Sequence, residues 1–257
     1  MKITTPLAGV AALGLALAVP AITAAASADS GSTYQATLSQ QNHSGASGTF
    51  MLTLNGSQAT ITEHVTGLAS TFNGAPYPHV QHIHINGQHM CPTPSADKNA
   101  DGVVNTTEGA PAYGPIGTTL SVSGGTAASD GTDVTIAPSG SSFDYSRTIT
   151  LDAATMSQVT AGNAVIVVHG LDPTTLSKKA QGEKSDLVPS LPLAATSPAL
   201  CGPLVASQMG SMPSGGAQTG DGGSVSGTNV ALATVGGMAL FVSGGMLIWR
   251  RRVDARS

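Results

Sequence analysis

Apolar and polar residues alternate with a period of two over most of the chain between residues 32 and 205. This alternation indicates half-exposed strands, and the Gly, Ser, Asn and Pro residues between them are typical of turns. So many short strands favour an all-β domain, either a sandwich or a barrel. The eight predicted strands lie at residues 33–39, 48–54, 58–66, 80–85, 118–123, 133–136, 145–151 and 164–168.

Three segments carry further information about their positions. In the strand at 58–66, Glu63 interrupts the apolar face, which predicts that this strand lies at an edge of the sheet. Residues 164–168 are apolar on both faces, so we expect them at the centre. One helical turn is predicted at 152–158, because Asp152 can cap its first turn.

The N-terminal end has a different pattern. Residues 6–25 are apolar, follow Lys2, and precede the small residues Ala26-Ser27-Ala28. This arrangement is typical of a secretory signal peptide, which we place at residues 1–28. The exported domain is then expected at residues 29–207.

The C-terminal end predicts an anchor. Residues 208–229 are rich in Gly and Ser and favour a flexible linker. The uncharged residues 230–249 are long enough for a transmembrane helix, and residues 250–257 form a basic tail on the cytoplasmic side. The segment Ala217-Gln218-Thr219-Gly220 also resembles a degenerate sortase signal, which would leave the domain on the cell wall. The localisation expected is therefore extracytoplasmic, at the membrane or the wall.

Charge excludes two classes of partner. Residues 29–228 contain five Lys and Arg residues against thirteen Asp and Glu residues, a net charge of −8, whereas the whole chain carries −4. So acidic a surface argues against nucleic acid and against anionic lipid.

Two histidines in one predicted strand are the first candidate metal ligands. Side chains two residues apart on a strand leave the same face, so the imidazoles of His82 and His84 lie side by side while Ile83 points to the other face. Paired imidazoles favour copper or zinc.

An acidic loop follows them. The run Asp97-x-Asn99-x-Asp101-Gly102, with Glu108 at its end, fits positions 1, 3, 5, 6 and 12 of an EF-hand calcium loop. Pro and Gly residues on both sides predict no flanking helices, and so an isolated loop. The expected calcium ligands are the side chains of Asp97, Asn99, Asp101 and Glu108 and the carbonyl of Val103.

Cys91 and Cys201 are the only two cysteines. In an exported chain, an isolated pair of cysteines favours a disulfide between them.

The order of these features resembles the copper-zinc superoxide dismutase family. The resemblance implies an eight-stranded Greek-key β-barrel, a copper ion on His82, His84 and His169, and the Cys91–Cys201 disulfide. Bacterial chordin-type (CHRD) domains are similar over the same histidine stretch and are the competing family. The segments that carry the resemblance are Val65-Thr66-Gly67-Leu68, His82-Ile83-His84, Cys91, Val167-Val168-His169 and Cys201-Gly202-Pro203-Leu204.

The chain also departs from the superoxide dismutase pattern. No histidine lies between Met90 and Val168, where that family keeps its bridging histidine and its other zinc ligands, so no zinc is expected. Residues 195–200 lack the family's catalytic arginine. A fourth copper ligand remains open between His64 and His89, whereas His79 and His43 are expected at the surface.

Two functions remain. The missing residues favour a surface metal-binding module without catalysis, tethered to the envelope. The alternative is a copper-only superoxide dismutase at the cell surface. Motifs for nucleophilic catalysis, for P-loop nucleotide binding and for dinucleotide binding are absent from the sequence.

Overall fold

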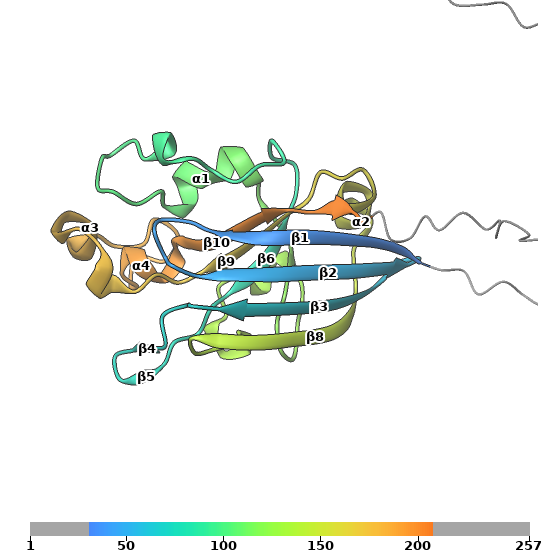
Figure 1. The fold of residues 1–257 in the computed structure, drawn as a ribbon, viewed down its shortest axis with the longest axis horizontal. Coiled ribbons are helices and arrows are strands. Elements are labelled where there is room, and N and C mark those ends of the chain that lie inside the picture. The colour runs from blue at the N-terminus through green and yellow to red at the C-terminus, as the bar shows by residue number, and fades with distance from the viewer. Residues whose placement is uncertain (1–30, 208–257) are drawn as a thin grey trace, which may run out of the picture. The chain divides into compact units, whose positions relative to one another are not determined.

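The computed structural model describes residues 31–207, which form a mostly β domain with a few short helices (Figure 1). The predicted signal peptide, linker, transmembrane helix and basic tail lie outside these residues. Within the described part, no helix is both long and apolar enough to cross a membrane.

The strands are β1 (Ser32–Gln40), β2 (Ser47–Asn55), β3 (Gln58–Thr66), β4 (Thr71–Phe72), β5 (Ala75–Pro76), β6 (Gln81–His84), β7 (Ile116–Thr119), β8 (Ser142–Thr150), β9 (Val165–His169), β10 (Pro198–Pro203) and β11 (Val205–Ala206). The α-helices are α1 (Thr106–Tyr113), α2 (Ala153–Thr160), α3 (Lys178–Gly182) and α4 (Leu193–Thr196). The 3-10 helices are η1 (Pro94–Ala96), η2 (Ala128–Asp130), η3 (Val134–Ile136) and η4 (Pro173–Thr175).

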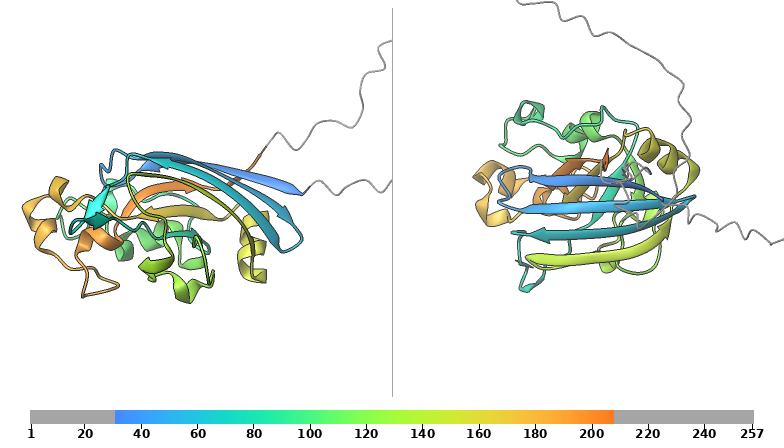
Figure 2. Two further views of the ribbon diagram at one scale, coloured as in Figure 1. Left: turned by 90° about the horizontal axis from the view of Figure 1, so that it is seen from below. Right: turned by 45° about the vertical axis from the view of Figure 1, so that its right-hand side comes forward.

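Nine of the strands form one antiparallel sheet in the order β7-β6-β9-β10-β1-β2-β3-β8, with β11 beside β1. The sheet curls into a half-barrel, as the left view of Figure 2 shows. Strands β4 and β5 form a separate small hairpin. The main apolar core fills the concave side of the curled sheet, where Leu52, Ile61 and Ile166 are completely buried. Burial of one such side chain stabilises the fold by about 1.5–3 kcal/mol.

Strand β3 shows how the alternating pattern builds this core. Ala59, Ile61 and Val65 point inward and are buried, while Thr60 and Thr62 point outward. Because the side-chain period of a strand is two, this pattern also sets the register with both neighbours.

The prediction that β3 is an edge strand is wrong. It pairs along its whole length with β2 and with β8, and Glu63 points into the interior, where 4% of it is exposed. The edges of the long sheet are β7 and β8 instead. Arg147 of β8 connects them, because its guanidinium donates to the carbonyls of Ser121 and Gly124 just after β7.

Strand β9 lies centrally, as its sequence predicts. Ile166 and Val168 belong to the main core on one face of the sheet. On the other face Val165 and Val167 pack with Tyr113 of α1 and with the Cys91–Cys201 disulfide. A strand covered on both faces needs no polar alternation.

Other elements differ from the sequence-based expectation. Residues 133–136 do not form a strand: the Asp133 side chain accepts the Thr135 N–H and caps η3. Strand β10 was not predicted, because Pro198, Gly202 and Pro203 weaken its β pattern. The helix after Asp152 is confirmed as α2, and the Asp152 side chain accepts the Thr155 N–H.

The expectation that no helix flanks the acidic loop is also wrong. Helix α1 begins at Thr106, within the last residues of the loop, and continues through Pro111. A capping box starts it: the Asn105 side chain accepts the Glu108 N–H, and the Glu108 carboxylate accepts the Asn105 N–H. Gly114 ends the helix with φ 89°, and a Cβ at this position would lie 2.0 Å from the Ile85 carbonyl oxygen. Only glycine fits there.

Candidate metal centre

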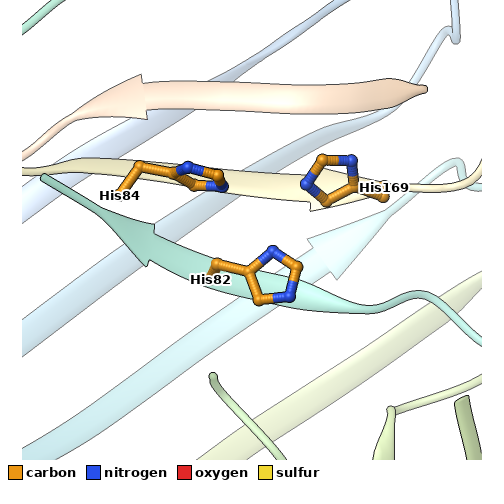
Figure 3. A group of neighbouring side chains, drawn as sticks. All are labelled: His82, His84 and His169. Carbon is orange, nitrogen blue, oxygen red and sulfur yellow. The ribbon is translucent and has the colours of Figure 1, made fainter. Parts of the chain in front are cut away.

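Three histidines come together on the face of the sheet opposite the main core (Figure 3). Strands β6 and β9 are paired, and His82 lies opposite Val167 while His84 lies opposite Val165. The alternation along β9 places His169 on the same face as Val165 and Val167. His82 and His84 therefore lie on the same face of β6, as predicted. The pairing of β6 with β9 brings His169 next to them.

Each imidazole is held by a backbone carbonyl. His82 Nε2 lies 2.9 Å from the Gly131 oxygen, His84 Nδ1 lies 2.8 Å from the Gly114 oxygen, and His169 Nδ1 lies 2.6 Å from the Thr196 oxygen. A carbonyl oxygen only accepts, so each of these ring nitrogens carries the proton. This assignment leaves the other nitrogen of each neutral ring with a free lone pair.

The three free nitrogens converge. His82 Nδ1, His84 Nε2 and His169 Nε2 are buried and lack a hydrogen-bond partner among the described residues. The ligand atoms of the three residues all lie within 4.8 Å of one another. Leaving a buried polar atom unpaired costs about 1–3 kcal/mol, so three such atoms on neighbouring rings call for a common partner.

Burial also keeps the three imidazoles neutral. It lowers the pKa of His84 to about 3 and that of His169 to about 4, and it holds the pKa of His82 well below its ordinary value. The neighbouring imidazoles lower the pKa values of His82 and His84 further. A neutral imidazole is the form that binds metal ions, and an N–H held by a carbonyl is the usual outer support of such a ligand. The residues therefore fit a metal ion, although the structure does not identify the element.

A pocket of about 310 Å³ opens onto the histidines. Helix α1 and residues 114–116, 131–134 and 187–196 supply most of its walls. Hydrogen bonds hold these walls in place: the Asp186 carboxylate accepts the Thr107 N–H at 2.7 Å, and the Thr106 hydroxyl donates to the Thr196 carbonyl that also holds His169. Tyr113 packs its ring against His84, with the ring centroids 4.6 Å apart.

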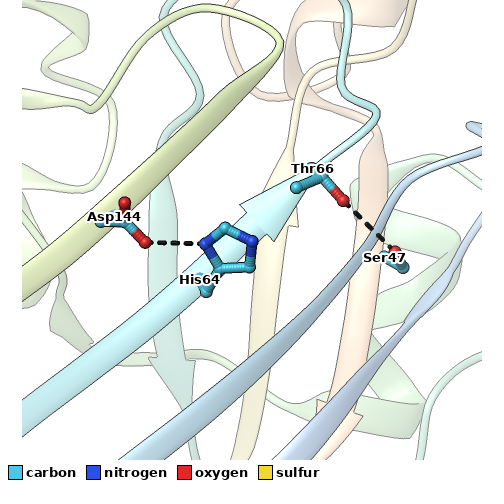
Figure 4. Close-up of polar contacts among 4 residues, drawn as sticks. All are labelled: Ser47, His64, Thr66 and Asp144. Atoms are coloured by element: carbon cyan, nitrogen blue, oxygen red, sulfur yellow. Dashed lines mark hydrogen bonds and ion pairs between the residues drawn. The ribbon is translucent and has the colours of Figure 1, made fainter.

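The structure joins neither candidate fourth ligand to this group. His64 lies on the exposed face of β3, where its Nδ1 pairs with Asp144 at 2.7 Å beside the Ser47–Thr66 contact (Figure 4). His89 lies near the Leu204 carbonyl, with its Nε2 3.3 Å from that oxygen. The described residues thus supply three histidines to the candidate centre.

The expectation that His79 lies at the surface is wrong, whereas His43 is exposed as expected. His79 is completely buried, and its ring nitrogens lie 2.9 Å from the carbonyl oxygens of His169 and Ala69. It thereby supports the end of β9 next to the metal centre. Gly170 makes room for it, since a Cβ there would come within 2.6 Å of His79 Nδ1.

The acidic loop is ordered by its own hydrogen bonds. The Asp97 carboxylate accepts the Gly102 N–H at 2.9 Å, and the Asp101 carboxylate accepts the Val103 N–H at 2.6 Å. Glu108 caps α1 and also accepts the Lys98 N–H at 2.7 Å. Calcium binding by this loop stays a prediction.

Sequence reasoning missed one acidic side chain at this loop. Asn99 donates to Glu183 at 3.1 Å and to Asp101 at 2.9 Å, so Glu183, which directly follows α3, reaches the loop. Partial burial and the nearby Asp101 carboxyl raise the pKa of Glu183. No local pattern could reveal this contact, because 84 residues separate Asn99 from Glu183.

The predicted disulfide is confirmed. Cys91 and Cys201 are bonded, with their Cα atoms 5.7 Å apart. The bond attaches the segment before the acidic loop to β10, which is next to β9 in the sheet.

The chain was compared with known protein families and with curated proteins, and neither comparison finds a match.

Proposed function

We propose that this domain is a metal-binding module that holds one copper ion between His82, His84 and His169. The observation that carries the proposal is the convergence of three buried, unpartnered imidazole nitrogens, each on a ring whose other nitrogen is held by a backbone carbonyl. Such a site is already arranged for binding, so little ordering entropy opposes it.

Copper is favoured for two reasons. Imidazole suits several transition metals, but copper(II) binds most tightly among the common divalent ions at such sites. The three residues are also those that the resemblance to copper-zinc superoxide dismutases assigns to copper. The fold proposed with it is that family's Greek-key barrel, which the long connections from β3 to β6 and from β8 to β9 across the antiparallel sheet support.

The site and the N- and C-terminal segments together suggest a setting for this module. We infer that the chain is exported and stays attached to the cell envelope, where the acidic loop also meets millimolar calcium. Recovery of a peptide containing Trp249 from the washed membrane fraction tests membrane attachment, and its absence from the cell-attached protein favours sortase processing.

A copper titration against a competing chelator tests the proposed site. We expect one ion per chain, and His82→Ala and His169→Ala should each weaken binding by more than about 100-fold although they lie 87 residues apart. The matched control is His64→Ala, because the His64 side chain is 60% exposed on β3 and does not belong to the three-histidine group. Equal losses in all three variants, or in none, would show adventitious binding, and thermal unfolding of each variant checks that it is folded.

The second candidate is a copper-only superoxide dismutase. The open pocket above the histidines favours it, since a sealed structural site would need no access. Two observations weigh against it: the described pocket lining contains no Lys or Arg to attract superoxide, and the exported part is acidic. A superoxide assay on the copper-loaded protein decides, and a rate near the diffusion limit would favour the enzyme.

A further inference from the structure

We propose that the pocket above the three histidines binds a small uncharged organic molecule with an apolar body and one polar atom, of which a simple phenol is the model. The inference rests on the proposed function in one respect: the histidines assigned to the metal form the floor of this pocket. The pocket itself exists in the protein without any ion.

The size of the pocket limits the ligand. Its volume of about 310 Å³ is at the lower end of the range of small-molecule sites, roughly 300–1,000 Å³. The walls are attached to one another by the hydrogen bonds of Asp186 and Thr106, so the space is largely preformed. A ligand built around a single ring matches it better than a nucleotide or a peptide.

The walls select against charge. Most of the lining is apolar, and the described residues that form it include no Lys, Arg, Asp or Glu. A charged ligand would lose its hydration here without gaining an opposite charge. The largest apolar side chains of the lining include Tyr113, Ile116, Val134, Leu187, Val188 and Leu191.

Few polar groups in this pocket are open to a ligand. The carbonyls of Gly114, Gly131 and Thr196 already accept the histidine N–H groups. The free imidazole nitrogens are buried below the pocket surface, so the polar groups left in the lining are the exposed hydroxyls of Thr107 and Thr132, which can donate or accept a hydrogen bond. One polar atom at one end of an otherwise apolar molecule satisfies this arrangement.

The rim of the pocket is apolar as well. Val134 and Leu187 both line it, yet they are 43% and 49% exposed. They are two of six large apolar side chains that are exposed within residues 31–207, and they come from segments 53 residues apart. Exposed apolar side chains gathered at the mouth of a cavity indicate a surface that becomes covered when a ligand binds.

The test is a calorimetric titration of the purified full-length protein with p-cresol, 4-methylbenzoate and 4-methylbenzylamine, which share a ring and differ in charge. We expect p-cresol to bind at one site per chain and the two charged probes to bind at least about tenfold more weakly. Saturable p-cresol binding together with this order supports the proposal. Equal binding of the three probes would overturn it.

A matched pair of variants locates the binding. Val134→Asp places a carboxylate at the rim and should weaken p-cresol binding by about tenfold or more. Val205→Asp is the control, because Val205 is 46% exposed but lies on β11, outside the pocket. Neither side chain is buried, so both variants should fold. Equal affinity of the two variants would show that p-cresol binds elsewhere and would refute the proposal.

Copper stoichiometry measured on the same samples separates the two proposals. If one copper ion binds per chain and p-cresol does not bind, the ligand proposal fails and the metal site stands. If p-cresol binds as expected and copper does not, the proposed function fails and the pocket stands.

Discussion

Buried polar side chains have two different roles in this domain. Each of the three site histidines is neutral and donates one ring N–H to a backbone carbonyl. The other ring nitrogen of each is unpaired, and the three rings are neighbours. Glu63 instead lies inside the half-barrel near Gln81 and Tyr145, and both of its carboxyl oxygens lack a hydrogen-bond partner among the described residues. Burial raises its pKa from 4.5 to about 8, and the neighbouring Gln81 amide offsets this only in part.

Glu63 therefore predicts that the free energy of unfolding falls as the pH rises from about 4.5 to 8. Because its pKa is higher in the folded protein, the folded state binds more protons than the unfolded state between about pH 4.5 and 8. The stabilisation is complete below this window and is lost as the pH rises through 8. One pKa unit corresponds to about 1.4 kcal/mol, so the loss should reach a few kcal/mol.

Urea unfolding of the wild type and of Glu63→Gln at pH 5 and pH 9 measures this effect. Glutamine keeps the size of the side chain but cannot ionise, so its free energy of unfolding should change much less between the two pH values. If both proteins lose stability in parallel, Glu63 does not cause the pH dependence.

At the level of single residues, the sequence predicts which side chains of a strand lie on the same face. His82 and His84 share a face because they are two residues apart, and this needs no knowledge of the fold. The partners of their N–H groups, Gly114 and Gly131, are brought there by loops, so no sequence pattern could identify them. The burial of His79 was missed for the same reason, since a segment 90 residues away covers it.

Among the elements, α1 links the acidic loop to the metal centre. Its first turn is capped by Asn105 and Glu108 at the end of the loop, and its last residue Tyr113 packs against His84. The sequence did not predict this helix, because Gly109 and Pro111 within it have a low helix propensity. Helix propensity is a weak guide where capping and packing determine whether a helix forms. The loop and the helix therefore form one continuous support for the pocket.

Calcium should stabilise this element if the loop binds it. At roughly 2 mM free calcium and an assumed dissociation constant near 0.1 mM, the gain would be about 1.8 kcal/mol, or a few degrees in melting temperature. Asp97→Asn should abolish the shift and leave the α1 cap intact, and Glu183→Gln should reduce it. Magnesium should substitute poorly, because it demands a tighter octahedral shell.

Differential scanning calorimetry in calcium, magnesium and chelator makes this comparison. Superimposable melting curves in calcium and in chelator would mean that the loop does not bind calcium. Hydrogen bonds from backbone N–H groups would then be enough to hold the loop carboxylates. The resemblance to a calcium loop would then be coincidental.

For the domain as a whole, the disulfide connects the loop layer to the sheet. Its closure spans 110 residues of sequence and joins the segment that carries the acidic loop to β10. Long closures restrict the unfolded chain most, and the chain-entropy model gives about 4–5 kcal/mol for this length. The free energy of unfolding of a typical domain is of similar size, roughly 5–15 kcal/mol.

Cys201→Ser should accordingly lower the melting temperature by roughly 10 °C or more, at about 2–4 °C per kcal/mol. Reduction of the wild type should have a similar effect, and reduction should not affect the variant further. An unchanged melting temperature would show that packing between α1 and β9 holds the layers together without the covalent bond.

The overall β class followed from the alternating pattern, because each long strand has one buried and one solvent-facing side. The curl of the sheet and its strand order could not be predicted from this pattern. They depend on pairings between distant segments, such as β1 with β10 and β6 with β9. Those pairings bring His169 to His82 and His84, so the complete site could be anticipated only through a family resemblance.

Electron paramagnetic resonance of the copper(II)-loaded protein tests the central claim most directly. We predict a single copper species at one ion per chain, with hyperfine coupling to three imidazole nitrogens, and a change to two in His169→Ala. His64→Ala should leave the spectrum unchanged. A mixture of species, or a spectrum that His169→Ala does not alter, would contradict the assignment of the three histidines to one metal ion.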